Sequence, residues 1–240
     1  MGMAVRRVDI IKRKYVKWIL GLDKGTPNYI IIEETKMREI KMKAVRRAIR
    51  YEDRASDTTK KLVQECIKDL EKEKPEGEGK WEKKRNELME TAGMRRDLLR
   101  NAKETGDQDV MENLANNLEG REKEKRQRKI NESKYNTIYK NIKTEEMPKY
   151  LEIRNRKDRN LLARYRCGNE TKGNQHWRTE GDRRCRICQT KEESMWHILK
   201  ECKVTKNEPR IVELVGEEGK GLNVLRRIEE VRREMREKVG

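Results

Sequence analysis

The sequence predicts a mainly α-helical protein with extended helical segments and a small CCHC zinc-knuckle module near its C-terminus. Charged residues make up 44% of the chain and hydrophobic residues 33%, which favours long solvated helices with small local cores. Apolar residues recur at three- and four-residue steps in several segments, as they do on one face of a helix. Three of the five cysteines and one of the two histidines lie within residues 185–202.

Composition and periodicity divide the chain into four regions. These are a basic helical region (1–80), a charged helical rod region (81–166), the zinc knuckle (167–205) and a C-terminal helix (206–240). In the first region the periodicity predicts a loop near residues 21–28, one helix from about Ile32 to Arg54, and another over residues 59–73. Cys66 falls on the apolar stripe of that last helix, which favours a buried thiol. A linker is expected at residues 74–80.

The second half of the chain shows clearer helical patterns. We expect one long helix over residues 121–143, preceded by a break near residues 105–107. Further helices are expected over residues 155–166 and from Leu222 to Lys238. Residues 167–184 are rich in Gly and Asn, which indicates a loop.

The formal net charge of +17 points to a polyanionic partner, with RNA or DNA as the first candidate. The excess is concentrated, because residues 1–50 carry 14 Lys and Arg against 5 Asp and Glu, and residues 121–166 carry 16 against 7. The alternative is a solvated helical surface rich in both signs.

A membrane partner is not expected from the sequence. No apolar stretch approaches the ~20 residues that a membrane span needs, and the first residues lack the apolar segment of a signal peptide. Arg6 stands where N-myristoylation requires Ser or Thr. We therefore expect an intracellular protein, cytoplasmic, nuclear or both.

The cysteine cluster has the spacing of a metal site. Cys185, Cys188, His197 and Cys202 form the pattern C-x2-C-x8-H-x4-C, and four such ligands fill a closed tetrahedral structural zinc site. Two alternatives stay open at this point, a buried cysteine cluster with a hydrogen-bonded histidine and a disulfide. Cys167 and His176 are possible additional ligands.

The spacing makes a geometric demand on the knuckle. The two residues between Cys185 and Cys188 are expected to form a tight turn, and Thr190 with Glu193 has the form of a capping box that starts a helix. On an uninterrupted α-helix His197 and Cys202 would lie about 140° apart. The helix must therefore end or tighten near Lys200, and we expect chelation to unfold residues 185–202 while leaving distant helices intact.

Several side chains near the knuckle are candidates for contact with nucleic acid. The candidates for phosphate contacts are Arg183, Arg184, Arg186, Arg164 and Arg166. The candidates for stacking on unpaired bases are Trp196, Trp177 and Ile187. For Trp196, local packing against the knuckle is an equally good interpretation.

Three stretches together resemble a known family. The knuckle, RYRCGNETKGNQHW (164–177) and WILGLDKGTPNYIIIEETK (18–36) resemble the C-terminal tail of reverse transcriptases from LINE-type (non-LTR) retrotransposons. The resemblance implies that the four knuckle residues are zinc ligands. It also implies a fragment that follows the polymerase palm, with the missing polymerase domain as a possible partner.

The resemblance implies that this chain alone is not an enzyme, because the family's pair of adjacent catalytic aspartates is absent from it. The sequence itself shows no hydrolytic triad and no phosphate-binding Gly loop. The expected function is a nucleic-acid-binding tail that holds RNA template or target DNA. The alternative is a helical scaffold for protein partners with a purely structural zinc site.

Overall fold

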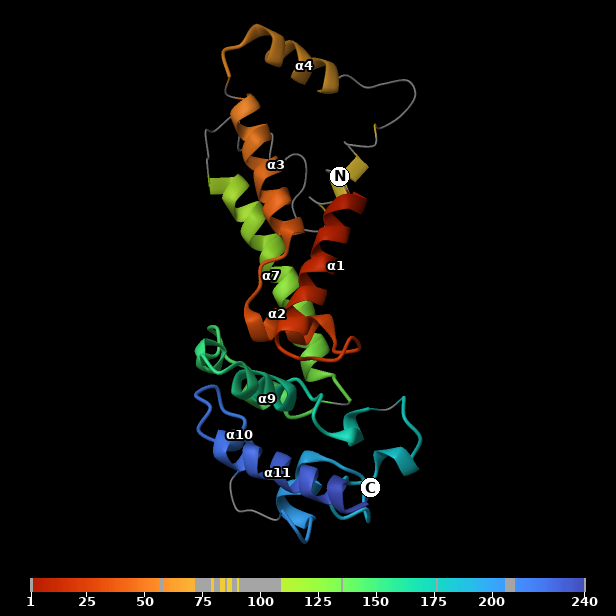
Figure 1. The fold of residues 1–240 in the computed structure, drawn as a ribbon. Helices are drawn as coiled ribbons and strands as arrows, with labels where there is room; N and C mark the ends of the chain where they lie inside the picture. The colour runs from red at the N-terminus through yellow and green to blue at the C-terminus, as the bar shows by residue number, and fades with distance from the viewer. Residues whose placement is uncertain are drawn as a thin grey trace. The chain divides into compact units, whose positions relative to one another are not determined.

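The computed structural model describes most of the chain and shows a mainly helical protein, as the sequence predicts (Figure 1). The described residues are 2–56, 58–71, 79, 83–84, 86–87, 90, 109–134, 136–175, 177–205 and 210–239. Within these ranges there is no β-strand, only a single bridge between Arg184 and Glu192. None of the helices in these ranges combines the length and the apolar character that crossing a bilayer requires.

Among the described residues, the named α-helices range from a single turn to 23 residues. The α-helices are α1 (Gly2–Ile19), α2 (Asn28–Thr35), α3 (Ile40–Ser56), α4 (Lys61–Glu71), α7 (Asp109–Asn131), α8 (Tyr139–Ile142), α9 (Arg156–Arg166), α10 (Ile211–Leu214) and α11 (Leu222–Val239). Single turns of 3₁₀-helix are η1 (Lys149–Glu152), η2 (Lys172–Asn174) and η3 (Gly181–Arg183), and η4 (His197–Glu201) is a π-helical turn.

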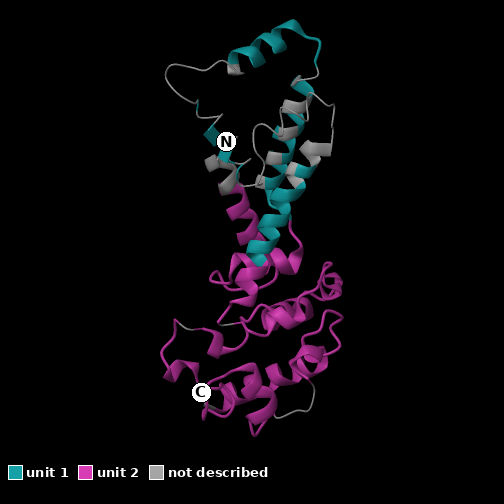
Figure 2. Ribbon diagram, turned by 180° about the vertical axis from the view of Figure 1, so that it is seen from behind, with its two compact units in different colours: residues 1–6, 38–126 teal, residues 7–37, 127–240 magenta. Residues whose placement is uncertain are grey.

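The chain forms two compact units, each made of separate segments (Figure 2). Unit 1 consists of residues 1–6 and 38–126, and unit 2 of residues 7–37 and 127–240. In unit 1, Arg46 of α3 pairs with Glu119 of α7 at 3.1 Å. The regions expected as knuckle and C-terminal helix both belong to unit 2, together with α2 and most of α1.

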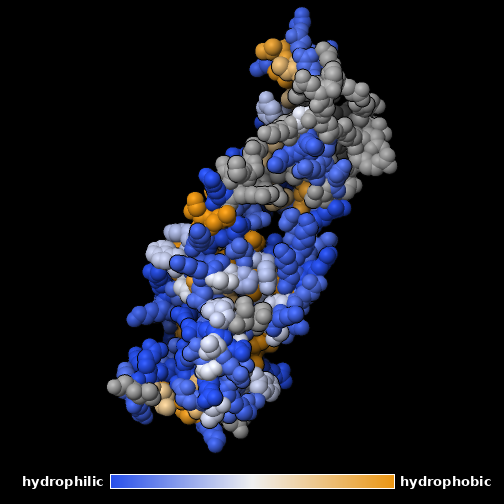
Figure 3. Space-filling view, turned by 90° about the vertical axis from the view of Figure 1, so that its right-hand side faces the viewer, coloured by the Kyte–Doolittle hydropathy of each residue, from blue (hydrophilic) through white to orange (hydrophobic). Residues whose placement is uncertain are grey.

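Unit 2 has one continuous core, where composition predicts only small local ones. Its buried apolar side chains include Ile30, Ile31, Tyr139, Tyr150, Leu162, Ile198, Leu199, Leu225 and Ile228. Two arginines, Arg166 and Arg232, are among its largest fully buried side chains. Ion-paired arginines thus fill volume that apolar residues would otherwise occupy. Figure 3 shows one face of the molecule, mostly hydrophilic with isolated hydrophobic patches.

Two predicted helices are interrupted. The helix expected from Ile32 to Arg54 breaks after α2, where Lys36 adopts a left-handed conformation with φ of 48°. The helix expected over residues 121–143 ends at Asn131 and resumes only as α8. Between them the Asn136 side chain donates to the carbonyl of Arg166 at 2.9 Å, and this tertiary contact outweighs helix continuation.

The other helix predictions are confirmed to within a few residues by α4, α9 and α11. The prediction for Cys66 is wrong, because its thiol is exposed and Leu62 on the same stripe is 72% exposed. The linker at 74–80, apart from residue 79, and the break at 105–107 lie outside the described residues.

Candidate metal centre

The four residues singled out by their spacing meet at one point. The ligand atoms of Cys185, Cys188, His197 and Cys202 all lie within 4.8 Å of one another. The Cys188 Sγ atom is 3.1 Å from Nε2 of His197, which identifies Nε2 as the ring nitrogen that faces the cluster. Three of the four residues are buried and Cys188 is partly buried. The cluster can therefore hold a metal ion, and all five cysteines are free thiols rather than disulfides.

The first two cysteines are held by a tight loop. The amide of Cys185 donates to the carbonyl of Lys191 at 2.7 Å, and the amide of Gln189 donates back to Cys185 at 3.0 Å. Gln189 reverses the chain with φ of 57°. Arg186 and Ile187 form the predicted turn, which brings both thiols to the same side.

The second pair of ligands comes from a helical turn that starts later than predicted. The capping box at Thr190 is wrong: the hydroxyl of Ser194 accepts from the His197 amide at 3.0 Å and so caps the turn. Residues 197–201 then form a π-helical turn, closed by the Cys202 amide donating to the His197 carbonyl at 2.7 Å.

The π turn brings the last two ligands together by widening the helix, whereas a shorter or tighter helix was expected. A bond from residue i to i+5 widens the turn, so residues five apart return to the same side of the axis. His197 and Cys202 are five apart and both reach the cluster. The prediction that a regular α-helix cannot span them is confirmed, and the helical turn ends at Glu201, one residue after the expected point.

The thiols lie in different electrostatic surroundings. Burial raises the pKa of Cys185 to about 12. Burial also acts to raise the pKa of Cys188, but hydrogen bonds with Thr190, His197 and Cys185 outweigh it and lower this pKa to about 6. Cys188 is thus more readily ionised than Cys185, and a metal ligand must be ionised.

The remaining ring nitrogen of His197 faces a carboxylate. Its Nδ1 atom is buried and lies 3.6 Å from Oε2 of Glu201. Glu201 is itself held by Lys191 at 3.0 Å and by the indole N–H of Trp196 at 3.2 Å. A carboxylate in this position orients a ligand histidine. Sequence reasoning did not identify Glu201 as part of the site.

Four protein ligands saturate a tetrahedral ion, so the centre offers no open position to a substrate or water. Chemically it is a structural site whose ion would fix the loop of Cys185 and Cys188 to the turn of His197 and Cys202. It does not provide the open coordination that metal-assisted hydrolysis needs.

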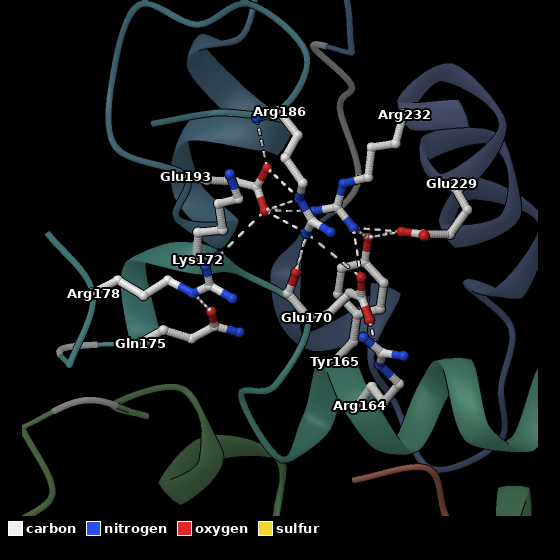
Figure 4. Close-up of polar contacts among 10 residues, drawn as sticks. All are labelled: Arg164, Tyr165, Glu170, Lys172, Gln175, Arg178, Arg186, Glu193, Glu229 and Arg232. Carbon is white, nitrogen blue, oxygen red and sulfur yellow. Dashed lines mark hydrogen bonds and ion pairs between the residues drawn. The ribbon is translucent and has the colours of Figure 1, made fainter. Parts of the chain in front are cut away.

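A buried ion network attaches this module to helices α9 and α11 (Figure 4). Arg186 of the knuckle loop binds Glu193 through Nε at 2.9 Å, and Arg232 of α11 binds Glu193 at 3.0 Å and Glu170 at 2.9 Å. Arg164 of α9 adds a 2.6 Å contact to Glu170. Glu193, Glu170 and Arg232 are at most 3% exposed.

Three arginines proposed as phosphate contacts instead form ion pairs within the protein. Arg186 belongs to the network above, and Arg164 is half exposed but paired with Glu170. The Arg166 side chain is 0% exposed. Its guanidinium donates to Glu34 at 2.5 Å, to the Val215 carbonyl at 2.6 Å and to the Ile142 carbonyl. A phosphate cannot reach Arg166 in this fold.

The other candidates lie at the surface with one exception. Trp177 and Trp196 are each 58% exposed, whereas Ile187 is 1% exposed and cannot serve as a stacking surface. Arg183 is partly exposed and pairs with Glu192 at 2.9 Å. Arg184 is exposed and has no ion pair within the described part of the chain. His176 lies outside the described residues, and buried Cys167 is not part of the ligand cluster.

No family model, curated protein or solved structure matches the chain. The resemblance to LINE-type reverse transcriptases therefore stays a prediction. The structure adds that two of the stretches behind that resemblance contact each other. Glu34 pairs with Arg166, and the Thr26 hydroxyl donates to the side-chain oxygen of Asn169 at 2.7 Å. These residues therefore have structural roles in the fold.

Proposed function

We propose that this chain binds nucleic acid as the C-terminal tail of a LINE-type reverse transcriptase. In this proposal the basic helices and the knuckle hold RNA template or target DNA, and the missing polymerase domain supplies the catalysis. The net charge of +17 supports a polyanionic partner. The resemblance of the knuckle and of the two upstream stretches supports the choice of family.

The metal we propose is zinc. Three thiolates and an imidazole are soft and borderline donors, and such donors favour zinc over hard cations. In a tetrahedral site with zinc–sulfur distances of ~2.3 Å, ligand atoms are ~3.8 Å apart. The ligand atoms, all within 4.8 Å of one another, need only small shifts to reach this geometry.

The observation that carries the proposal is the contrast between the two sides of the knuckle. Three of its four ligands and Glu193 are buried, whereas Trp196 and Arg184 of the same module are exposed. An exposed indole offers a face to an unpaired base, and an unpaired guanidinium offers donors to a phosphate. The module thus presents both kinds of contact outward while its metal centre keeps their spacing fixed.

The knuckle contributes little of the total charge. Residues 178–203 carry 7 Lys and Arg against 5 Asp and Glu, and a zinc ion with three thiolates adds a centre of net charge about −1. Most of the attraction to phosphates must therefore come from the basic helices. We expect the knuckle to position the strand and the helices to provide most of the salt-dependent affinity.

Replacement of Arg184 tests this division. Arg184→Ala should lower affinity for RNA and DNA of any sequence by a similar factor, because phosphate contacts carry no sequence information. The slope of log K against log salt should fall by about 1, the loss of one phosphate contact. Fluorescence anisotropy with the zinc-loaded chain and labelled 20-nucleotide RNA and DNA, from 50 to 300 mM salt, measures both quantities.

Lys220→Ala is the matched control, since it also removes one exposed positive charge but from the loop before α11, where Lys220 is 83% exposed and paired with Glu218. This variant should leave the slope unchanged. Equal slopes for the wild type, R184A and K220A would remove the knuckle from the interface. Failure of the wild-type chain to bind either nucleic acid would reject the proposed function itself.

The second candidate is a helical scaffold with a purely structural metal. It is favoured by the buried network, because Arg186 and Glu193 tie the knuckle to α9 and α11 rather than leaving it as an independent binding module. In that case the knuckle would only hold the helices in place for a protein partner. The same anisotropy experiment separates the two, since a scaffold requires no affinity for nucleic acid at 150 mM salt.

A further inference from the structure

The exposed face of α1 carries a row of large apolar side chains. Ile11, Tyr15 and Trp18 are 65%, 57% and 64% exposed. Their spacing of four and three residues places them on one side of the helix. The helix is held against the core of unit 2 by the partly buried Val16 and Ile19 and by Leu20, the residue after the helix, which is 4% exposed. The row is therefore on a helix whose position is fixed, and it is not needed to fill the core.

Two of these rings form an ordered stack with an arginine from another helix. The ring centroids of Tyr15 and Trp18 are 5.8 Å apart with an interplanar angle of 30°. The guanidinium carbon of Arg156, at the start of α9, lies 5.4 Å from the centroid of the Trp18 ring. Because stacking already restricts the rings, a ligand that adds to them loses little of their rotational entropy.

The charge around this stack is positive. Arg7 and Lys14 lie on the same exposed face of α1, and Arg156 itself is exposed. The one acidic residue among residues 7–18 is Asp9, which is 5% exposed. A ligand at the rings thus meets cationic side chains on several sides and no exposed carboxylate of this helix segment.

We propose that Tyr15, Trp18 and Arg156 form a stacking site for single-stranded nucleic acid, separate from the knuckle. An unpaired base would extend the ring stack, and its flanking phosphates would contact Arg7 and Lys14. A second copy of this chain fits the surface poorly, because it would bring like charges together. The inference rests on the proposed function and adds a second point of contact to it.

The test uses the full zinc-loaded chain and three labelled probes: a 12-nucleotide oligo(U), a 12-nucleotide oligo(dT) and a 12-base-pair DNA duplex. Trp18→Ala should weaken binding of both single strands roughly 5- to 100-fold, the effect of losing one base–aromatic stack. Binding of the duplex should change less than 2-fold, because its bases are already stacked on one another. Trp18→Phe keeps a ring and should restore most of the single-strand affinity.

Tyr51→Ala is the control, since Tyr51 on α3 is an exposed aromatic residue, 73% exposed, outside the proposed site. It should bind all three probes as the wild type does. Far-UV circular dichroism of W18A should match the wild type, because the Trp18 side chain lies at the surface.

Two results would overturn the inference. They are single-strand affinity of W18A equal to that of the wild type, and an equal loss for single strands and duplex. If the wild type binds single strands and W18A does so equally well, this inference alone fails. If the wild type binds none of the probes, the proposed function fails as well.

Discussion

At the scale of single residues, a carboxylate that is not one of its ligands lies beside the metal centre. His197 presents Nε2 to the cluster, 3.1 Å from the Cys188 sulfur, and turns Nδ1 toward Glu201. Lys191 and Trp196 hold that carboxylate in place. We therefore expect Glu201 to help orient the ring for metal binding.

This arrangement predicts the effect of Glu201→Gln. The amide keeps the size of the side chain but removes its negative charge. That charge favours a proton on Nδ1 of His197 and so makes Nε2 a better electron-pair donor to the metal. We expect zinc affinity to fall roughly 10-fold or more, the usual cost of losing such a partner. Competition of the purified chain against a chromogenic zinc chelator measures the change.

Glu192→Gln is the matched control for this prediction. Glu192 is a carboxylate of the same module with a 51% exposed side chain, paired with Arg183 rather than with a ligand. Its replacement should leave zinc affinity within about 2-fold of the wild type. Equal affinities for E201Q and the wild type would show that Glu201 does not position His197.

The ligands were predictable at this scale and their partners were not. Cysteine and histidine are rare in this chain, so four of them in one window stand out. Glu170, Glu193 and Arg232 are hidden among the 44% of residues that are charged. For the same reason Arg166 and Arg186 were indistinguishable in sequence from surface arginines, although tertiary contacts bury or engage them.

At the scale of elements, the knuckle is built into the packing of α9 and α11. Three arginines and three glutamates meet at their junction, namely Arg164, Arg186, Arg232, Glu170, Glu193 and Glu229 (Figure 4). The formal charges balance, which buried ions require. Arg186 and Glu193 lie in the loop that carries the first two metal ligands. Metal binding and helix packing should therefore be coupled.

Metal removal tests this coupling. Chelation should increase amide hydrogen exchange throughout residues 185–202, as the sequence already suggests. It should also increase exchange in α11 around Arg232, because unfolding of the knuckle loop removes Arg186 and Glu193 from the network. Hydrogen–deuterium exchange read by mass spectrometry, with and without chelator, maps both effects.

Helix α4 is the internal control, since it belongs to the other compact unit and contains none of the network residues. Its exchange should not respond to chelation. Increased exchange confined to residues 185–202, with α11 unchanged, would show that the knuckle and the helix are energetically independent.

Element prediction worked where local pattern and tertiary structure agree. The stretches that became α9 and α11 have regular apolar periodicity, and α9 is preceded by the N-cap residue Asn155, whose side chain accepts from the Lys157 amide. The break at Lys36 in the helix expected after Ile32 was not predicted. Its backbone is left-handed, and nothing in the local sequence marks a lysine for that conformation. The amine of Lys36 contacts Glu33 and the carbonyl of Thr144, a partner far away in sequence.

At the scale of the whole molecule, unit 2 joins parts of the chain that 89 intervening residues separate. The junction is the buried carboxylate of Glu34, which is 1% exposed. It accepts hydrogen bonds from Tyr139 at 2.9 Å and Tyr150 at 2.7 Å, and it pairs with Arg166. One side chain of α2 thus contacts α8, η1 and α9. No local sequence pattern reveals a contact of this range.

Glu34→Ala should therefore destabilise unit 2 as a whole. The substitution leaves the Arg166 charge buried without its partner and leaves two tyrosine hydroxyls without their acceptor. Breaking a buried ion pair from one side costs about 3–5 kcal/mol, a large fraction of a typical stability. Urea unfolding of the zinc-loaded chain, followed by tryptophan fluorescence, measures the difference in the free energy of unfolding.

Glu145→Ala is the control for this last prediction, because Glu145 is an exposed carboxylate of the same unit and its loss should cost well under 1 kcal/mol. The double variant Glu34→Ala with Arg166→Met removes both charges of the pair. It therefore separates the cost of the unpaired charge from the other effects of losing Glu34. If the unpaired charge is the main cost, the double variant should be more stable than E34A alone. A loss below about 1 kcal/mol in E34A would mean that water or another group replaces the carboxylate, and that the apolar core alone holds the separated segments together.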